Sequence, residues 1–163
     1  MAGVVIRPSV IADADVVRDL RLEALRDNAA AFRSRYEDLQ YWTRSQWEAL
    51  AAAPATYLAE VDGRVVGHVR GGLGDPDEDQ QRRWLYGMFV VLAFRGGLVG
   101  PALVDRVLTW ARDDGGASLF LNVATSNGRA EAFYRKMGFA PTGLVTPHET
   151  REQLWFTETS RPL

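Results

Sequence analysis

The sequence contains no cysteine, and this absence excludes several kinds of chemistry. Disulfide bonds, thiolate nucleophiles and cysteine-ligated metal sites all require that side chain. Histidine is scarce as well: only His68 and His148 are present, and they lie too far apart in the chain for a metal-ligand spacing. The composition therefore predicts a protein without a metal centre.

Lysine is nearly absent, since Lys136 is the only one and arginine carries almost all of the basic charge. The net charge is -2, so no overall positive field indicates a nucleic-acid partner. No apolar run approaches the roughly 20 residues that span a bilayer, and residues 1–7 lack the apolar core of a signal peptide. We expect a cytoplasmic protein with neither nucleic acid nor membrane as a partner.

The residues that are present indicate one globular domain over residues 1–163. The hydrophobic fraction is 47% and the charged fraction is 25%, both ordinary values for such a domain. Apolar residues at helical spacing predict helices over 13–27, 44–53 and 101–112, and a short helix that ends at Gly138. β-Prone runs predict strands over 4–7, 56–61, 64–70, 84–91, 118–123, 143–145 and 153–157, and residues 71–83 are expected to form a polar loop.

Two of the expected strands flank Asp62-Gly63, a dipeptide typical of a tight β-hairpin. In the run 118–123, Leu119, Leu121 and Val123 should share one face of a strand, with Phe120 on the other. Because strands and helices alternate around one hairpin, the pattern favours an α/β (α+β) fold with a mixed sheet covered by helices.

A glycine-rich turn separates the apolar run 84–91 from the helix-like run 101–112. Its sequence is Arg95-Gly96-Gly97-Leu98-Val99-Gly100. Such a turn exposes several backbone N–H groups where the helix dipole is positive, which suits a phosphate or pyrophosphate. Arg95 could add a charge-assisted contact. A plain connecting turn would show the same glycine pattern, so the turn alone does not decide.

A second cluster follows about thirty residues later, comprising Asn127, Ala130, Phe133, Tyr134, Gly138 and Phe139. Ala130, Phe133, Tyr134 and Met137 are spaced so that they share one helix face. That spacing is equally typical of ordinary core packing, and Asn127 would be explained by capping the helix.

Together the two clusters resemble the GNAT superfamily of acetyl-CoA-dependent N-acetyltransferases. Its members carry an Arg/Gln-x-x-Gly-x-Gly/Ala turn after a central strand, and further on the pattern Asn-x-x-Ala-x-x-Phe/Leu-Tyr-x-x-x-Gly-Phe. The resemblance extends over nearly the whole chain. It implies a largely antiparallel sheet of six to seven strands with a splayed strand pair, acetyl-CoA as cofactor, and acetyl transfer to a primary amine of a small molecule or peptide. Homodimers are frequent in this superfamily.

The resemblance also assigns residues. Tyr134 is expected to protonate the departing thiolate as a general acid, since a phenol with pKa near 10 keeps its proton at neutral pH. The main chain of the run Phe89, Val90 and Val91 is expected to bind the pantetheine amides, and an amide N–H near Val90 to polarise the thioester carbonyl. The remaining residues expected to bind the cofactor are Arg95, Gly96, Gly97, Leu98, Val99, Gly100, Asn127, Phe133 and Tyr134.

Leu98 departs from the family pattern, which usually has glycine there. A leucine at positive φ would be strained, so either this backbone has ordinary dihedral angles or cofactor affinity is reduced. A non-catalytic CoA-binding or regulatory domain therefore remains an alternative, as does an acyltransferase that uses another acyl-CoA.

The sequence defines the binding site of the acceptor amine less well. The aromatic segment 32–47 is expected to line it, with Tyr36 and Trp42 as substrate contacts, although aromatic residues there also suit ordinary core packing. The general base is left open among Glu23, Glu37, Glu60, Glu149, His148 and an ordered water. His68, among apolar neighbours in a strand, is expected to be structural.

Overall fold

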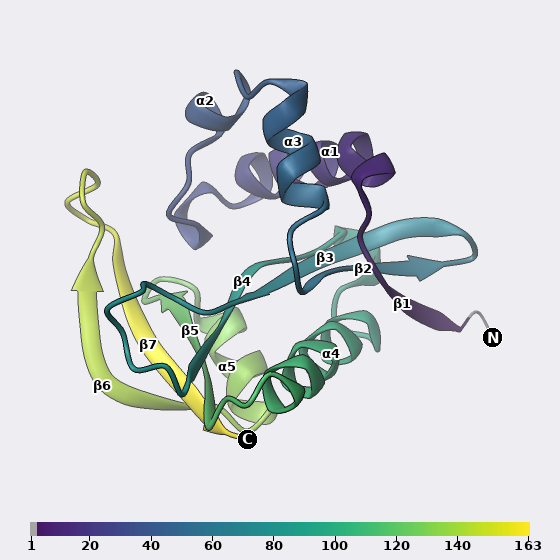
Figure 1. Ribbon diagram of the computed structural model, residues 1–163. Coiled ribbons are helices and arrows are strands. Elements are labelled where there is room, and N and C mark those ends of the chain that lie inside the picture. Colours follow the sequence, from purple (N-terminus) through teal and green to yellow (C-terminus); the bar gives the residue numbers. More distant parts are fainter. Residues whose placement is uncertain (1–2) are drawn as a thin grey trace.

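The computed structural model describes residues 3–163, whose seven strands form one mixed sheet (Figure 1). Every neighbouring pair is antiparallel except β4 and β5, which confirms the expected largely antiparallel sheet. The strand order is β1-β2-β3-β4-β5-β7-β6. The strands are β1 (Val4–Pro8), β2 (Thr56–Val61), β3 (Arg64–Gly72), β4 (Arg82–Val90), β5 (Ser118–Ala124), β6 (Ala140–Pro147) and β7 (Trp155–Pro162).

Helices cover both faces of the sheet (Figure 1). The α1 face is covered by α1 (Ala14–Asp27), α2 (Tyr36–Leu39) and α3 (Arg44–Ala51), and the α4 face by α4 (Val99–Asp113) and α5 (Gly128–Lys136). Each face has its own apolar core: Leu58 and Phe89 pack with α1 and α3, whereas Leu103 and Leu121 belong to the core on the α4 face. Three short 3-10 helices are η1 (Ile11–Asp13), η2 (Ala29–Ala31) and η3 (Leu92–Phe94).

Local sequence signals account for several of these elements. Asp62 and Gly63 have φ of 50° and 75°, so the predicted hairpin turn is confirmed. Thr43 accepts a hydrogen bond from the N–H of Gln46 and thereby caps α3. The predicted alternation in β5 is also confirmed, because Leu119 and Leu121 are buried in the core on the α4 face.

Some predicted boundaries were wrong. The segment 71–83 is not wholly a loop, because β3 continues to Gly72 and β4 begins at Arg82. Two consecutive arginines hide the start of β4 from a hydropathy pattern, although both join the ladder with β5. Helix α4 begins at Val99 rather than Pro101. Strands β6 and β7 are longer than predicted. The sequence did not indicate the extent of β6, because this strand is exposed along nearly all of its length and lacks an apolar alternation.

Strands β4 and β5 are paired over a short stretch only. The three parallel pairs join Arg82, Arg83 and Trp84 to residues 118–120, and no pairing is present between the two strands beyond Trp84 in the described part of the chain. The expected splayed strand pair is therefore present. The main chain of the second half of β4 consequently has one side without a neighbouring strand.

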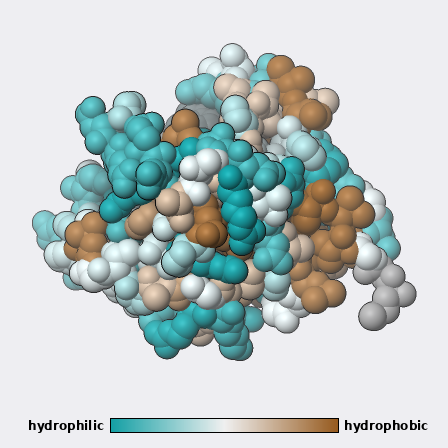
Figure 2. Space-filling view, turned by 60° about the horizontal axis from the view of Figure 1, so that its bottom comes forward, coloured by the Kyte–Doolittle hydropathy of each residue, from teal (hydrophilic) through white to brown (hydrophobic). Residues whose placement is uncertain are grey.

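The surface carries no dominant apolar area on the side where α4 lies. Seen from there, apolar side chains form separate patches among polar ones (Figure 2). Within residues 3–163, none of the helices has the length and apolar character needed to cross a bilayer.

A buried arginine joins the start of β4 to the end of α4. Arg83 is 7% exposed; its Nε donates to Asp114 Oδ2 at 2.7 Å and its Nη1 donates to the carbonyl of Gln80 at 2.7 Å. The Asp114 side chain is 43% exposed, so water can replace part of its interaction if the arginine is lost. The pair fixes the strand and the helix that border the glycine-rich turn.

We expect Arg83→Met to lower the free energy of unfolding by about 2–3 kcal/mol, the lower end for a broken buried pair, because Asp114 can be rehydrated. Urea denaturation would measure the change. Arg112→Met, at an exposed position near the end of the same helix, is the control and should alter stability by less than about 0.5 kcal/mol. Equal losses in the two variants would contradict this role for Arg83.

Candidate active site

A β-bulge interrupts the pairing of β4 with β3, beyond the point where β4 and β5 separate. His68 pairs with Phe89 and Arg70 pairs with Tyr86, so one residue of β3 lies opposite two residues of β4. Gly87, in the bulge, has φ of 58°, a conformation that glycine adopts without strain. The bulge lies within the part of β4 that is unpaired with β5, since the pairing of these two strands ends at Trp84.

The bulge is held by a side chain from the neighbouring strand. His68 is 4% exposed, and its Nδ1–H donates to the carbonyl of Gly87 at 2.9 Å. Burial lowers the pKa of His68 to about 4, with smaller contributions in the same direction from Arg21 and Arg70. The ring is therefore neutral at pH 7, and its structural role agrees with the expectation from sequence.

Val90 presents main-chain groups to the gap. It lies opposite Gly67, and the N–H of the next residue, Val91, donates to the carbonyl of Val66 at 2.9 Å. In an antiparallel ladder this pattern makes Gly67 and Val90 a pair without hydrogen bonds of its own, so the N–H and C=O of Val90 face away from β3. Of the three residues expected to offer main-chain groups, Val90 is thus the one that faces the gap.

The glycine-rich turn exposes consecutive main-chain donors. Gly96 has φ of 77°, whereas Leu98 has φ of -82° and ψ of -17°, so leucine stands there without strain. Within residues 3–163, no acceptor binds the N–H of Gly96, Gly97 or Leu98, and no side chain caps α4. An uncapped helix start with free amides has the geometry and the dipole to bind a diphosphate.

Arg95 has a different position from the one expected of a phosphate ligand. Its Nε donates to the carbonyl of Val90 at 2.7 Å, and its Nη2 pairs with the carboxylate of Asp27 at the end of α1. Its guanidinium also lies 5.4 Å from the ring centroid of Phe89. In this arrangement Arg95 fixes the end of β4 to α1, and a contact with phosphate stays a prediction.

Helix α5 places Tyr134 next to the core on the α4 face. Asn127 accepts a hydrogen bond from the N–H of Ala130 at 3.2 Å and caps the helix, which is one of the two roles that the sequence suggested for it. Phe133 packs against Gly100: a Cβ on this glycine would lie 3.3 Å from the ring. Helix α5, which carries the second cluster of the family pattern, is therefore in direct contact with the glycine-rich turn.

The environment of Tyr134 keeps its hydroxyl protonated. The side chain is 8% exposed, with ring centroids 5.0 Å from Phe133 and 5.7 Å from Phe139. Burial raises the pKa of the phenol above its usual value, so the Tyr134 hydroxyl keeps its proton throughout the neutral and mildly alkaline range. A general acid must hold its proton before the reaction, and Tyr134 meets this requirement.

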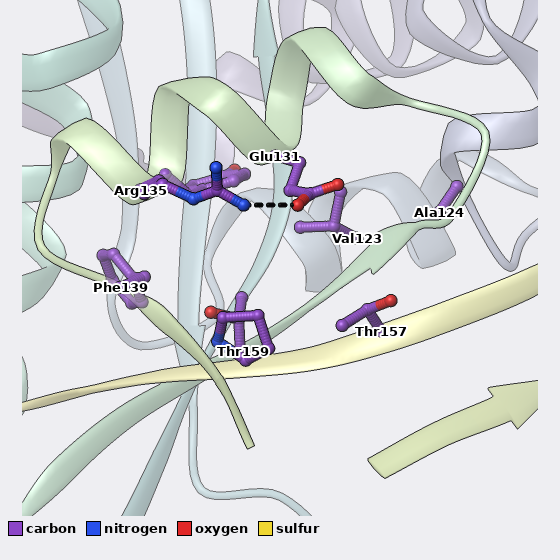
Figure 3. A pocket seen from close by; sticks show the side chains of 9 residues that line it. Val123, Ala124, Glu131, Arg135, Phe139, Thr157 and Thr159 are labelled. Carbon is purple, nitrogen blue, oxygen red and sulfur yellow. Dashed lines mark hydrogen bonds and ion pairs between the residues drawn. The ribbon is translucent and has the colours of Figure 1, made fainter. Parts of the chain in front are cut away.

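A small cavity lies beneath α5 (Figure 3). It is bordered by Val123, Thr157 and Thr159, together with Tyr134. Arg135 and Glu131 also border it and form an ion pair, with 2.8 Å between Arg135 Nη2 and Glu131 Oε1. Its volume of about 20 Å³ has room for about one water molecule. The cavity is therefore too small to hold a substrate.

The two residues expected to contact the acceptor pack among the first three helices. The hydroxyl of Tyr36 accepts a hydrogen bond from Arg26. Trp42 lies 4.9 Å from Trp47, ring centroid to ring centroid, in the core on the α1 face. A substrate contact at either residue stays a prediction.

Three candidates for the general base are engaged elsewhere. Glu60 is bound by Arg7 at 2.7 Å between β1 and β2, and Glu149 is bound by Arg33 at 2.8 Å. His148 donates from Nε2 to the carbonyl of Arg33 at 3.0 Å, while its Nδ1 accepts two main-chain N–H groups at 3.1 and 3.2 Å. With both ring nitrogens engaged, His148 has no free lone pair for a substrate proton.

Glu23 and Glu37 differ in their relation to the gap. Glu37 lies on the exposed surface of the short helix α2. Glu23 lies one turn before Asp27 on the same face of α1, at an open hollow of about 540 Å³, and Asp27 is linked through Arg95 to Val90. Glu23 is exposed, like Glu37, and its role as the general base stays a prediction.

Reasoning from sequence missed Arg21, Arg70 and the bulge at Gly87. The one available signal was a glycine inside an otherwise apolar strand pattern, which often marks a bulge. The two arginines had no local signal, because β-pairing and helix packing bring them together across the α1 face.

Comparisons with known proteins agree with this arrangement. Residues 21–139 match the model of the acetyltransferase (GNAT) family. The chain belongs to the GNAT acetyltransferase family. The human protein N-acetyltransferase 8 is 38% identical over 89 residues, which cover 53% of this chain and 39% of that protein. An uncharacterised N-acetyltransferase of Mycobacterium tuberculosis is 36% identical over 92 residues, 56% of each chain.

These matched segments span about half the length of the two relatives. Solved structures share the GNAT fold over nearly the entire chain. A GCN5-related N-acetyltransferase from Kribbella flavida has a TM-score of 0.80 at 23% identity, over 98% of both chains. YncA from Salmonella typhimurium, described as a putative acetyltransferase with its cofactor acetyl-CoA, has a TM-score of 0.79 at 21% identity, over 99% of this chain and 94% of that one.

The buried neutral His68 predicts a specific dependence of stability on pH. The unfolded chain protonates this ring near pH 6.5 and the folded chain near pH 4, so the unfolded state binds more protons between these values. Stability due to His68 is therefore fully present above pH 6.5 and lost as the pH falls toward 4, by up to about 3 kcal/mol.

His68→Asn keeps a donor near Nδ1 without a titrating ring. We expect its free energy of unfolding, measured by urea denaturation from pH 7 to 4, to decline less than that of the wild type. Parallel pH profiles for the two proteins would show that His68 does not titrate in this way.

Proposed function

We propose that this protein is an N-acetyltransferase that moves the acetyl group of acetyl-CoA directly to a primary amine of a small molecule or peptide. The observation that carries the proposal is the outward-facing main chain of Val90, at the mouth of the gap between β4 and β5. The free amides of the turn 95–100 lie beside it, at the start of α4. A carrier with a diphosphate and an extended amide-containing arm fits these two features together.

The acetyl-CoA in the structure of YncA from Salmonella typhimurium supports the choice of carrier. In this chain the main-chain N–H groups from Gly96 to Gly100 would hold the diphosphate. The next residue, Pro101, has no N–H and would not contribute. The main chain of Val90 would hold the pantetheine arm. Phe133 and Asn127, from the neighbouring helix α5 and its cap, would also contact the cofactor.

Acetyl-CoA would supply the acetyl group as a thioester. The N–H of Val90 would donate to the thioester carbonyl oxygen and stabilise negative charge on it. As the amine nitrogen forms the new C–N bond and the C–S bond breaks, Tyr134 would give its proton to the sulfur, and the amine would release a proton to a base. The products are an acetamide and free coenzyme A, and solvent returns the proton to Tyr134.

The alternative of a non-catalytic CoA-binding domain was motivated by Leu98. Its ordinary dihedral angles remove the expected strain, so this residue no longer favours that alternative. Formation of a homodimer, which the family resemblance implied, stays a prediction.

The proposal is tested by two measurements on the full chain. Calorimetry should detect binding of acetyl-CoA, and a thiol reagent should detect coenzyme A released in the presence of a panel of primary amines. A protein that binds neither acetyl-CoA nor coenzyme A is not the enzyme proposed, and one that binds both without transfer to any amine supports the non-catalytic alternative.

The two ends of α4 offer a matched test of the diphosphate site. Gly96 and Gly115 both have φ of 77°, and a Cβ at either position would have no neighbour within 4 Å. Alanine at either position should cost about 1–2 kcal/mol of stability, because the backbone strain is the same.

Only Gly96→Ala should also weaken the binding of acetyl-CoA, by about tenfold, because the added methyl group lies where a phosphate would approach the amides. Gly115→Ala should leave the dissociation constant unchanged. Calorimetric titrations that give equal constants for the two variants would place the diphosphate elsewhere.

Tyr134→Phe tests the general acid. We expect kcat to fall by about 10²–10⁴-fold, with the dissociation constant for acetyl-CoA unchanged, because the ring remains and only the proton donor is removed. Tyr41→Phe, at a side chain that is 80% exposed, is the matched control. Steady-state kinetics with wild-type kcat in Tyr134→Phe would exclude the proposed role.

A further inference from the structure

Two arginines on the α1 face lie beside the gap without an acid partner. Arg21 comes from α1 and Arg70 from β3, and both are half-buried. Among the described residues, neither forms an ion pair with a carboxylate within 4.0 Å. Two guanidinium groups close together without a negative charge are an unfavourable arrangement that a bound anion would relieve.

Both arginines border the bulge of β4. Nη1 of Arg21 lies 3.6 Å from the position that a Cβ on Gly87 would take, and His68 Cε1 lies 3.5 Å from the same position. Arg70 pairs with Tyr86, the residue before the bulge, and its guanidinium lies 5.2 Å from the centroid of that ring. Since His68 and Arg70 are two residues apart in β3, their side chains share the α1 face.

The hydrogen-bonding capacity of Arg21 is incompletely used. Nη2 is 3.4 Å from the hydroxyl of Ser34, a long contact, and the guanidinium lies 4.8 Å from the ring centroid of Phe32. Nη1 is buried and has no acceptor in the part of the chain that the structure describes. Burial and, to a smaller extent, Arg70 lower the pKa of Arg21 to about 10. Stacking on aromatic rings leaves the in-plane N–H groups of both arginines free to donate.

We propose that Arg21 and Arg70 bind a carboxylate of the acceptor, so that the preferred acceptors are amino acids or similar amines with a carboxylate close to the amino group. The planar fork of N–H groups in arginine matches the two oxygens of a carboxylate. This inference rests on the proposed function, since it names the class of amine that the same site acetylates.

The separation along β4 agrees with such an acceptor. Gly87 and Val90 are three residues apart, at most about 10 Å at the rise of about 3.3 Å per residue of a regular strand, and less here because the bulge bends the strand. An amine that attacks a carbonyl held by Val90 would have its carboxylate a few ångströms farther along β4, toward Gly87. Tyr86, on the same face, offers an aromatic surface to a side chain of the acceptor.

The test compares acceptor pairs that differ only in the carboxylate: leucine with leucinamide, phenylalanine with phenylalaninamide, and glycine with glycinamide. With acetyl-CoA and the full chain, kcat/KM should be at least tenfold higher for the carboxylate member of the preferred pair. This order would hold even though the amino group of the amide is the less basic one and is more fully deprotonated at neutral pH.

Two substitutions assign the effect to the arginines. Arg21→Gln and Arg70→Gln should each raise KM for the carboxylate acceptor tenfold or more, while the dissociation constant for acetyl-CoA and KM for the amide acceptor stay within twofold. Two matched controls should resemble the wild type: Arg18→Gln on α1, half-buried like Arg21 but paired with Asp19, and Arg64→Gln at an exposed position on β3.

The outcomes separate this inference from the proposed function. Equal or better acetylation of the amides by the wild type would overturn the inference and leave the acetyltransferase intact. If no acceptor of the panel is acetylated, binding of N-acetylleucine and N-acetylleucinamide in the presence of coenzyme A decides. Tighter binding of the carboxylate, lost in Arg21→Gln and Arg70→Gln, supports the inference, and equal or undetectable binding overturns it.

Discussion

The hydrogen bond from His68 Nδ1 to the carbonyl of Gly87 holds the conformation on which the rest of the candidate site depends. It stabilises a bulge in the middle of the sheet, shortly beyond Trp84, where the pairing of β4 with β5 ends. Because the pairing ends there, the main chain of Val90 is left without a strand partner on one side. A neutral, buried imidazole thus holds the part of β4 that borders the gap.

Contacts remote from β4 hold the segment that follows α1. The segment between α1 and α2 is fastened to the connection of β6 and β7 by three side chains: Arg33 pairs with Glu149, His148 donates to the carbonyl of Arg33, and Arg151 donates to the carbonyl of Ala29 at 2.9 Å. Parts of the chain more than 110 residues apart therefore border one region. The polar connection 147–155, which has no motif, contributes to its shape.

The parts of the site that sequence predicted are those that short segments encode. The turn 95–100 and the helix face with Tyr134 are local patterns, so their spacing was sufficient, and the doubt about Leu98 was settled by its dihedral angles. Arg21, His68 and Arg70 act through neighbours on other elements, and no local pattern announces such contacts. The extent of β6 was missed for a related reason, since this edge strand is largely solvated and lacks an alternation of apolar residues.

The short parallel ladder between β4 and β5 has a mechanical consequence. One portion of the sheet, with β1 to β4, meets the portion with β5 to β7 through three residue pairs and the helices beneath. Few main-chain bonds oppose a hinge-like opening along this seam, so amide hydrogen exchange should be faster there than elsewhere in the sheet interior. An extended ligand lying in the seam would bridge the two strands where main-chain bonds between them are lacking. Its binding would restrain the two portions as one cooperative unit.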